Sequence, residues 1–134
     1  MENKIVIDAS GCVMGRLASF MAQQALRGKE VIVVNCNDAV ITGSVSGIQE
    51  KYVTLRQKGG SSLRGPRIIR IPEKIVKRTA RGMLPHKKGM GSLALKRIMC
   101  YNGVPAEFSA VEKVSPKKPL KVKAITLKEI CKII

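Results

Sequence analysis

The amino-acid sequence predicts an α/β domain in which helices pack on a small, mainly parallel sheet. Two short apolar runs flank a segment of helical periodicity within the first 34 residues. This is the pattern of a strand–helix–strand unit, whose crossover makes the two strands parallel. The chain has 134 residues, near the common size of one domain. Aromatic residues make up only 3%, so we expect an aliphatic core of Ile, Val, Leu, Ala and Met.

The first unit begins with residues 4–8 (KIVID), an apolar run that predicts a buried strand leading into a turn at Gly11 and Gly15. From Met14 to residue 26, apolar residues recur at every third or fourth position, as in a helix with one apolar face. Gly28 is a typical helix end. Residues 31–34 (VIVV) then predict a second strand, buried on both faces.

Shorter elements follow along the chain. Proline is common at the first position of a helix, glycine ends helices, and short apolar runs predict strands. We therefore predict a strand at 39–41, a helix at 44–56 ended by Gly59 and Gly60, a helix beginning at Pro72 and ending at Gly82, a short helix at 92–97, and a core strand at 98–101.

We place the α/β domain at residues 1–108. Residues 109–134 predict an extended basic C-terminal segment, because the run at 115–119 (SPKKP) combines proline with lysine. A short helix is expected at its end, where Thr126 and Glu129 have the spacing of a capping box.

The charge is large and unevenly distributed. The chain has 25 Lys and Arg against 9 Asp and Glu, a net charge of +16. Residues 1–55 hold five basic and five acidic residues, whereas residues 56–97 hold thirteen basic residues and a single acid, Glu73. Such an excess opposes compaction unless a polyanion neutralises it. The middle of the chain is therefore predicted to be a site for a polyanion.

The helix that begins at Pro72 is predicted to have one cationic face and one packing face. Its packing face would consist of Ile75, Val76, Thr79, Ala80 and Met83. Arg binds phosphate oxygens in pairs and Lys supplies a point charge, so the cationic face and its flanks suit a nucleic-acid backbone. The predicted RNA-contacting residues are Arg64, Arg67, Arg70, Lys74, Lys77, Arg78, Arg81, His86, Lys87, Lys88, Lys96 and Arg97. With so few aromatic residues, we expect recognition of RNA shape and backbone and little base stacking.

The segment 11–16 (GCVMGR) invites a nucleotide-binding interpretation, because helix N-termini attract phosphate. Its spacing matches neither the P-loop nor the dinucleotide pattern. A tight structural turn is therefore favoured over a mononucleotide site, with a phosphate contact of RNA through Arg16 as a third alternative. Acids are too rare in the basic part for a pair of catalytic carboxylates. His86 is more plausible as a loop residue facing solvent or phosphate than as a general base.

Neither a metal nor a cofactor is expected. The four cysteines, at positions 12, 36, 100 and 131, form no C-x-x-C pair, and His86 is the one histidine of the chain. Free thiols in the reducing cytosol are the natural interpretation. There is no signal-like apolar segment and no apolar run of about 18 residues, so neither a secreted nor a membrane-spanning chain is expected.

Several short motifs occur together in a specific order. They are Asp8-Ala9, the run at 15–19 (GRLAS), Val34-Asn35 leading to Ile41-Thr42-Gly43, the run at 81–85 (RGMLP), and Tyr101-Asn102-Gly103. In this order and spacing the chain resembles the family of ribosomal large-subunit protein thirteen over most of residues 4–108. The bacterial members have a His-Pro-His segment where residues 104–108 (VPAEF) stand here, so the chain is more similar to the archaeal and eukaryotic branch.

The resemblance implies a three-layer α/β/α domain with a four-stranded parallel sheet. It also implies a structural, non-enzymatic role in the large subunit in the cytoplasm, with a part in early assembly. Large-subunit ribosomal RNA and neighbouring ribosomal proteins are the implied partners, with no small-molecule substrate and no membrane. A free RNA-binding translational regulator that uses the same cationic face is the alternative function.

Overall fold

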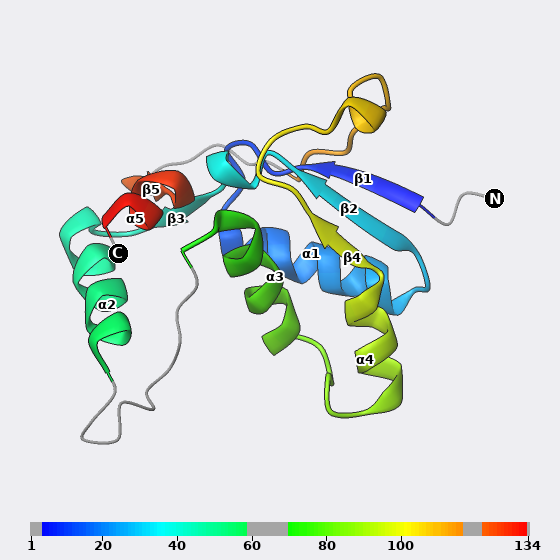
Figure 1. The fold of residues 1–134 in the computed structure, drawn as a ribbon, viewed down its shortest axis with the longest axis horizontal. Coiled ribbons are helices and arrows are strands. Elements are labelled where there is room, and N and C mark those ends of the chain that lie inside the picture. The colour runs from blue at the N-terminus through cyan, green and yellow to red at the C-terminus, as the bar shows by residue number, and fades with distance from the viewer. Residues whose placement is uncertain (1–3, 59–69, 117–121, 134) are drawn as a thin grey trace.

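The computed structural model describes residues 4–58, 70–116 and 122–133 (Figure 1). Its strands are β1 (Lys4–Asp8), β2 (Glu30–Val34), β3 (Val40–Thr42), β4 (Ile98–Cys100) and β5 (Ala124–Thr126). Its helices are α1 (Met14–Leu26), α2 (Val45–Gln57), α3 (Pro72–Gly82), α4 (Gly89–Lys96) and α5 (Leu127–Ile133), with 3₁₀ turns η1 (Cys36–Asp38) and η2 (Ala106–Phe108).

The main sheet has the strand order β1-β2-β4, and both of its strand pairs are parallel. The strands are in register such that Val6, Ile32 and Met99 lie side by side. The α/β class is therefore confirmed, and so is the strand–helix–strand unit formed by β1, α1 and β2.

Beside β1 the described residues form an isolated parallel bridge between Ile7 and Val114. The Val114 N–H donates to the Val6 carbonyl, and the Asp8 N–H donates to the Val114 carbonyl, both at 2.9 Å. The next bond of such a ladder would need an N–H at Pro116, which proline lacks. The sheet therefore has three strands and the beginning of a fourth.

The C-terminal segment contributes a strand that the sequence did not predict. β5 pairs with β3 in an antiparallel two-stranded sheet, with Ile41 opposite Ile125. The Glu129 N–H donates to Thr126 Oγ1 at 3.3 Å, which confirms that Thr126 caps α5. Leu127 and Ile130 of α5 are buried in the main hydrophobic cluster, so this end of the chain packs against the rest.

The two faces of the main sheet are covered differently (Figure 1). On one face α1 buries Leu17, Ala18 and Met21, and it packs against both α3 and α4. The other face is covered by η2, whose Phe108 packs with Val6, Ile32 and Val34. The core is aliphatic, as predicted, with Phe108 the one aromatic residue among the buried hydrophobics of the described chain.

The predicted helices are present, with shifted ends. Ser44 is the N-cap of α2 and its hydroxyl accepts the Gly47 N–H at 3.4 Å; Gly59 and Gly60, predicted to end this helix, lie outside the described residues. α4 begins at Gly89, three residues before the predicted start. None of the helices in the described ranges is long and apolar enough to cross a membrane.

Candidate nucleic-acid interface

Helix α3 presents the predicted cationic face because its opposite face is anchored in the core. Pro72 is the first residue of the helix, and Ile75, Val76 and Ala80 are buried. The prediction that Met83 packs was wrong: its side chain is 46% exposed. Met83 is the C-cap, where the chain leaves the helix, and Leu84 is buried in its place.

The cations of α3 come together along one groove. Lys74, Lys77, Arg78 and Arg81 line it, with Leu95 of α4 as the apolar part of the lining, and its volume is about 340 Å³. Lys77 is half-buried and the other three cations are exposed. We call these four residues and Leu95 the α3 groove. All four of its charged residues are positive, so the groove is suited to an anion.

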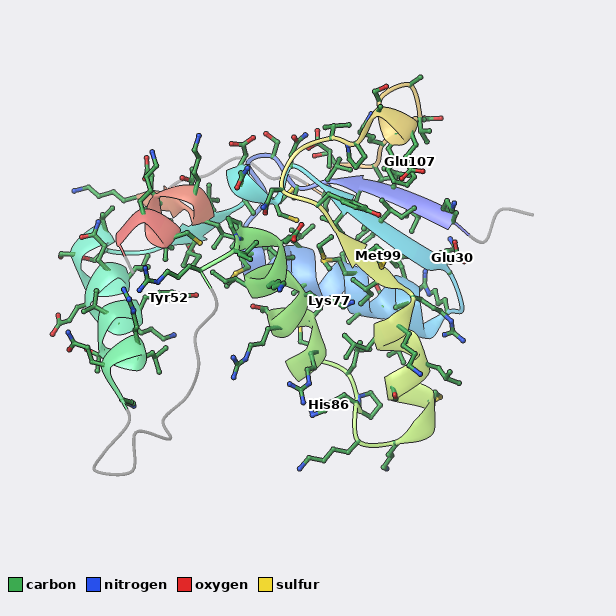
Figure 2. All side chains as sticks on the ribbon, in the orientation of Figure 1. Glu30, Tyr52, Lys77, His86, Met99 and Glu107 are labelled. Carbon is green, nitrogen blue, oxygen red and sulfur yellow. The ribbon has the colours of Figure 1, made fainter. Side chains whose placement is uncertain are left out.

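The segment between α3 and α4 carries the next predicted residues (Figure 2). Lys87 and Lys88 are exposed, whereas His86 is half-buried. The Nδ1 atom of His86 lies 3.3 Å from the carbonyl oxygen of Arg81. Since a carbonyl only accepts, Nδ1 is the donor in this contact. This contact holds the His86 ring against the end of α3, and the predicted contact of His86 with phosphate stays a prediction.

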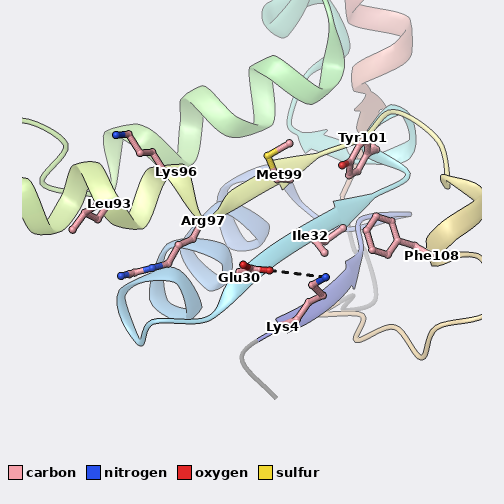
Figure 3. Close-up of a pocket in the computed structure, with 9 residues that line it drawn as sticks. All are labelled: Lys4, Glu30, Ile32, Leu93, Lys96, Arg97, Met99, Tyr101 and Phe108. Carbon is pink, nitrogen blue, oxygen red and sulfur yellow. Dashed lines mark ion pairs between the residues drawn. The ribbon is translucent and has the colours of Figure 1, made fainter. Parts of the chain in front are cut away.

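Lys96 and Arg97 do not join the α3 groove. They line a second hollow of about 440 Å³ together with Met99, Tyr101 and Phe108 (Figure 3). The Nη1 atom of Arg97 also donates to the Ala25 carbonyl at 3.0 Å, near the end of α1. Of the remaining predicted residues, Arg70 is exposed directly before α3, while Arg64 and Arg67 lie outside the described residues.

The turn between β1 and α1 is a structural turn. The Gly11 N–H donates to the Asp38 carbonyl and the Cys12 N–H donates to the Ala9 carbonyl, both at 3.0 Å. Gly11 has a φ of 73°, a conformation that glycine adopts at low cost. These bonds and the conformation of Gly11 hold the turn in its shape.

The thiols do not form a metal site in the part of the chain that the structure describes. No group of three or more His, Cys, Asp or Glu side chains there is placed to bind a metal ion. None of the four cysteines forms a disulfide. The hydrogen bond with Cys100, together with burial, raises the pKa of the Cys36 thiol above its ordinary value. Burial likewise raises the pKa of Cys131. These groups remain protonated thiols at neutral pH.

Three residues that support the groove were not identified from sequence. Asn102 accepts the Glu73 N–H through its Oδ1 atom at 3.0 Å and so caps α3 from a distant loop. Gly91 of α4 lies directly against the backbone of Pro85. Leu95 contributes the apolar lining. Asn102 lies in one of the motifs by which the sequence resembles its family, and so does Pro85, the residue against which Gly91 packs. The sequence offered no sign of the roles that these residues have in supporting α3 and α4.

The fold and the groove together define a small basic α/β protein with a cation-lined groove and no catalytic constellation among its described residues. Residues 2–107 match the family model for ribosomal protein L13, and the chain belongs to that family. Since this is a family of ribosomal structural proteins, the prediction of a non-enzyme is confirmed.

Curated relatives extend the match over almost the whole chain. The chain is 46% identical to large ribosomal subunit protein uL13 of Methanococcoides burtonii over 110 residues, which cover 82% of this chain and 78% of the relative. It is 42% identical to the uL13 protein of Methanocaldococcus jannaschii over 130 residues, covering 95% and 94% of the two chains. The uL13 protein of Natronomonas pharaonis is 42% identical over 127 residues, covering 94% and 87%. These archaeal relatives confirm the predicted branch of the family.

Proposed function

We propose that the chain is a structural constituent of the large ribosomal subunit in the cytoplasm, and that its α3 groove binds phosphates of large-subunit ribosomal RNA. The observation that carries the proposal is the groove itself, where four cations converge without an acidic lining residue. Arg70 before α3 and the pair Lys87 and Lys88 after it continue the basic surface at both ends of the helix.

The chemistry of the groove favours the RNA backbone over the bases. Arg78 and Arg81 supply guanidinium forks that bind two phosphate oxygens at once, and Lys74 and Lys77 supply point charges. The groove lining contains no aromatic ring. Tyr101 and Phe108, whose ring centroids are 5.9 Å apart, pack against each other at the second hollow. Stacking on bases is therefore not part of the groove, and the RNA is recognised by its shape.

The electrostatics of α3 also favour a bound anion. Like charges three or four residues apart on a helix cost about 0.2–0.5 kcal/mol per pair in the free chain. The four cations form four such pairs, namely 74 with 77 and 78, and 81 with 77 and 78, while Glu73, four residues before Lys77, offsets about one of them. Phosphates placed among them convert this repulsion into attraction. Because the surface gains its stability from RNA, we propose that the chain joins the RNA early in subunit assembly.

The salt dependence of binding tests this function. The full chain is titrated with fragments of large-subunit ribosomal RNA at several salt concentrations, and the slope of log K against log salt is measured. Each phosphate contact contributes about 0.7–0.9 to the slope. Lys77→Ala and Arg81→Ala should each lower the slope by about one contact, whereas Lys128→Ala, an exposed lysine of α5, should leave it unchanged. A slope near zero for the wild-type chain refutes the proposal.

Sedimentation separates the structural role from that of a free regulator with the same cationic face. In lysates fractionated after a moderate salt wash, a subunit constituent sediments with the large subunit. A free RNA-binding translational regulator remains in the light fractions. Recovery of the chain mainly in the light fractions would reject the structural role and favour the alternative.

A further inference from the structure

The second hollow is an apolar surface with a charged rim (Figure 3). We call it the β4 hollow; it is lined by Lys4, Glu30, Ile32, Leu93, Lys96, Arg97, Met99, Tyr101 and Phe108. It lies on the sheet face opposite α1, where Ile32 of β2 is the neighbour of Met99 on β4. η2 covers the neighbouring Val6 and Val34, but it does not cover Met99, which is 48% exposed.

Two large aliphatic side chains of the β4 hollow are exposed. Leu93 on α4 is 55% exposed, and Met99 is 48% exposed. α4 continues this apolar surface along its length, since Met90, three residues before Leu93, is 67% exposed. Exposed aliphatic side chains that adjoin one another in a concave surface mark a binding site more often than isolated ones do.

The rings of the β4 hollow are poorly suited to an RNA base. Phe108 is only 8% exposed, and its ring packs at 43° against Tyr101. Base stacking needs an open aromatic face, whereas the exposed apolar side chains of this hollow are those of Leu93 and Met99. Aliphatic and Met side chains are typical of the centre of a protein–protein interface. The apolar lining therefore favours a protein partner.

The rim specifies the charge of that partner. Lys96 and Arg97 stand side by side in sequence where α4 meets β4. Glu30 begins β2 beside Arg97, since the next residue, Val31, donates its N–H to the Arg97 carbonyl at 2.9 Å. The Glu30 carboxylate lies 3.9 Å from the Lys4 ammonium, so it already has a cation of this chain beside it. Because Arg97 already donates to the Ala25 carbonyl, the exposed ammonium of Lys96 is the main positive charge that the rim offers to an incoming carboxylate.

We propose that the β4 hollow is the docking site for a protein neighbour, which inserts an apolar side chain over Met99 and Leu93 and places an Asp or Glu near Lys96 and Arg97. α4 then separates two contacts, with RNA on the side of Leu95 and protein on the side of Leu93. That this protein neighbour belongs to the large subunit rests on the proposed function. The residues of the β4 hollow are, however, different from those of the α3 groove.

Photocrosslinking in the full chain tests this docking site. The photoreactive residue p-benzoylphenylalanine is introduced at position 99, and at position 54 as a control. Thr54 is exposed on α2, at the other end of the molecule from α4 (Figure 1). Intact cells are irradiated, RNA is digested, and the adducts are identified by mass spectrometry. The expected result is one dominant adduct at position 99, with a protein segment that has an apolar residue within two positions of an Asp or Glu.

Charge reversal adds a second measurement. In the position 99 chain, Lys96→Glu should lower the adduct yield per chain severalfold, whereas Lys128→Glu at an exposed position of α5 should leave it unchanged. Adducts with RNA, a protein segment without acidic residues, or a yield at position 99 no higher than at position 54 would each overturn the proposal. The adduct tests the docking site, and it is measured whether or not the chain sediments with large subunits. Sedimentation of the same samples tests the proposed function separately.

Discussion

Asn102 caps helix α3 although 29 residues separate it from Glu73, whose N–H its Oδ1 atom accepts at 3.0 Å. Ile71, the residue at the N-cap position, has an apolar side chain and makes no capping bond. The loop after β4 therefore supplies what the helix itself lacks. Since α3 carries the groove cations, this contact links the end of the parallel sheet to the position of the groove.

Removing this cap should loosen α3. Asn102→Ala is expected to lower the free energy of unfolding by about 1 kcal/mol, the usual cost of losing a capping side chain. For a chain of this size that is a fall in Tm of about 3–5 °C. Asn102→Asp is the matched control, because it keeps an acceptor oxygen and adds a charge that the helix N-terminus favours. Equal losses in the two variants would show that the cap is not the cause.

Gly91 should be intolerant of a side chain, unlike its neighbour Gly89. A Cβ at position 91 would collide with the backbone of Pro85, which has no flexible end that could move aside. A Cβ at position 89 would meet nothing within 4 Å. We expect Gly91→Ala to cost about 2 kcal/mol of unfolding free energy. Gly89→Ala should be neutral or slightly stabilising, as in most open helix positions. Urea unfolding of both variants measures the difference, and similar midpoints would contradict it.

The fold class could be predicted from sequence because the apolar patterns of β1, α1 and β2 match the structure that these residues adopt. The apolar periodicity of α1 and the runs of β1 and β2 specify a parallel pair by themselves. β5 could not be predicted, since it pairs with β3, a strand more than 80 residues away, and its three residues have no distinctive pattern. The missing N–H of Pro116 explains why the ladder beside β1 does not continue after Val114, but only once the register is known.

The candidate site was predicted where its residues share one helix. Helical spacing alone places Lys74, Lys77, Arg78 and Arg81 on one face, and the structure brings these four together. Lys96 and Arg97, predicted as RNA contacts with these four, lie apart from the α3 groove, because the chain turns from α4 into β4 and carries them to the β4 hollow. Tertiary packing decides on which side of a short helix a neighbouring cation lies. A local sequence pattern does not predict this.

The buried thiols predict a loss of stability at alkaline pH. The folded-state pKa of Cys36 is raised above its ordinary value of 9.0 by the hydrogen bond with Cys100 and by burial. Below pH 9 the Cys36 thiol is protonated in both the folded and the unfolded chain, so it does not make the unfolding free energy depend on pH. Above pH 9 only the unfolded chain releases the proton, which favours unfolding by up to about 1.4 kcal/mol per pH unit.

Cys36→Ala should therefore flatten the alkaline limb of the stability curve. The unfolding free energy of both chains is measured from about pH 8 to pH 10.5 in the presence of a reductant. Burial raises the pKa of Cys131 in the same direction, so a smaller slope should remain in the variant. Parallel curves above pH 9 for the wild type and the variant would contradict the assignment to Cys36.

Lys74→Glu should stabilise the free chain while it weakens RNA binding. In the wild type, exposed Lys74 repels Lys77 and Arg78, its neighbours at three and four residues along α3. A glutamate there attracts both, and as an anion in the first turn it also interacts favourably with the helix N-terminus. We expect a gain of about 1 kcal/mol in unfolding free energy at low salt, which should largely disappear at about 1 M salt because such surface interactions are screened.

Lys74→Gln is the matched control, since it removes the repulsion without adding the attraction and should give about half the gain. Thermal unfolding at low and high salt measures the stability of all three chains, and RNA titration measures affinity. A Lys74→Glu chain that is less stable than the wild type at low salt would contradict the view that α3 is electrostatically strained without its ligand. A gain in stability together with a loss of RNA affinity would support the proposed function. A lysine that lowers the stability of the free chain is best explained by an anion that it contacts in the bound state.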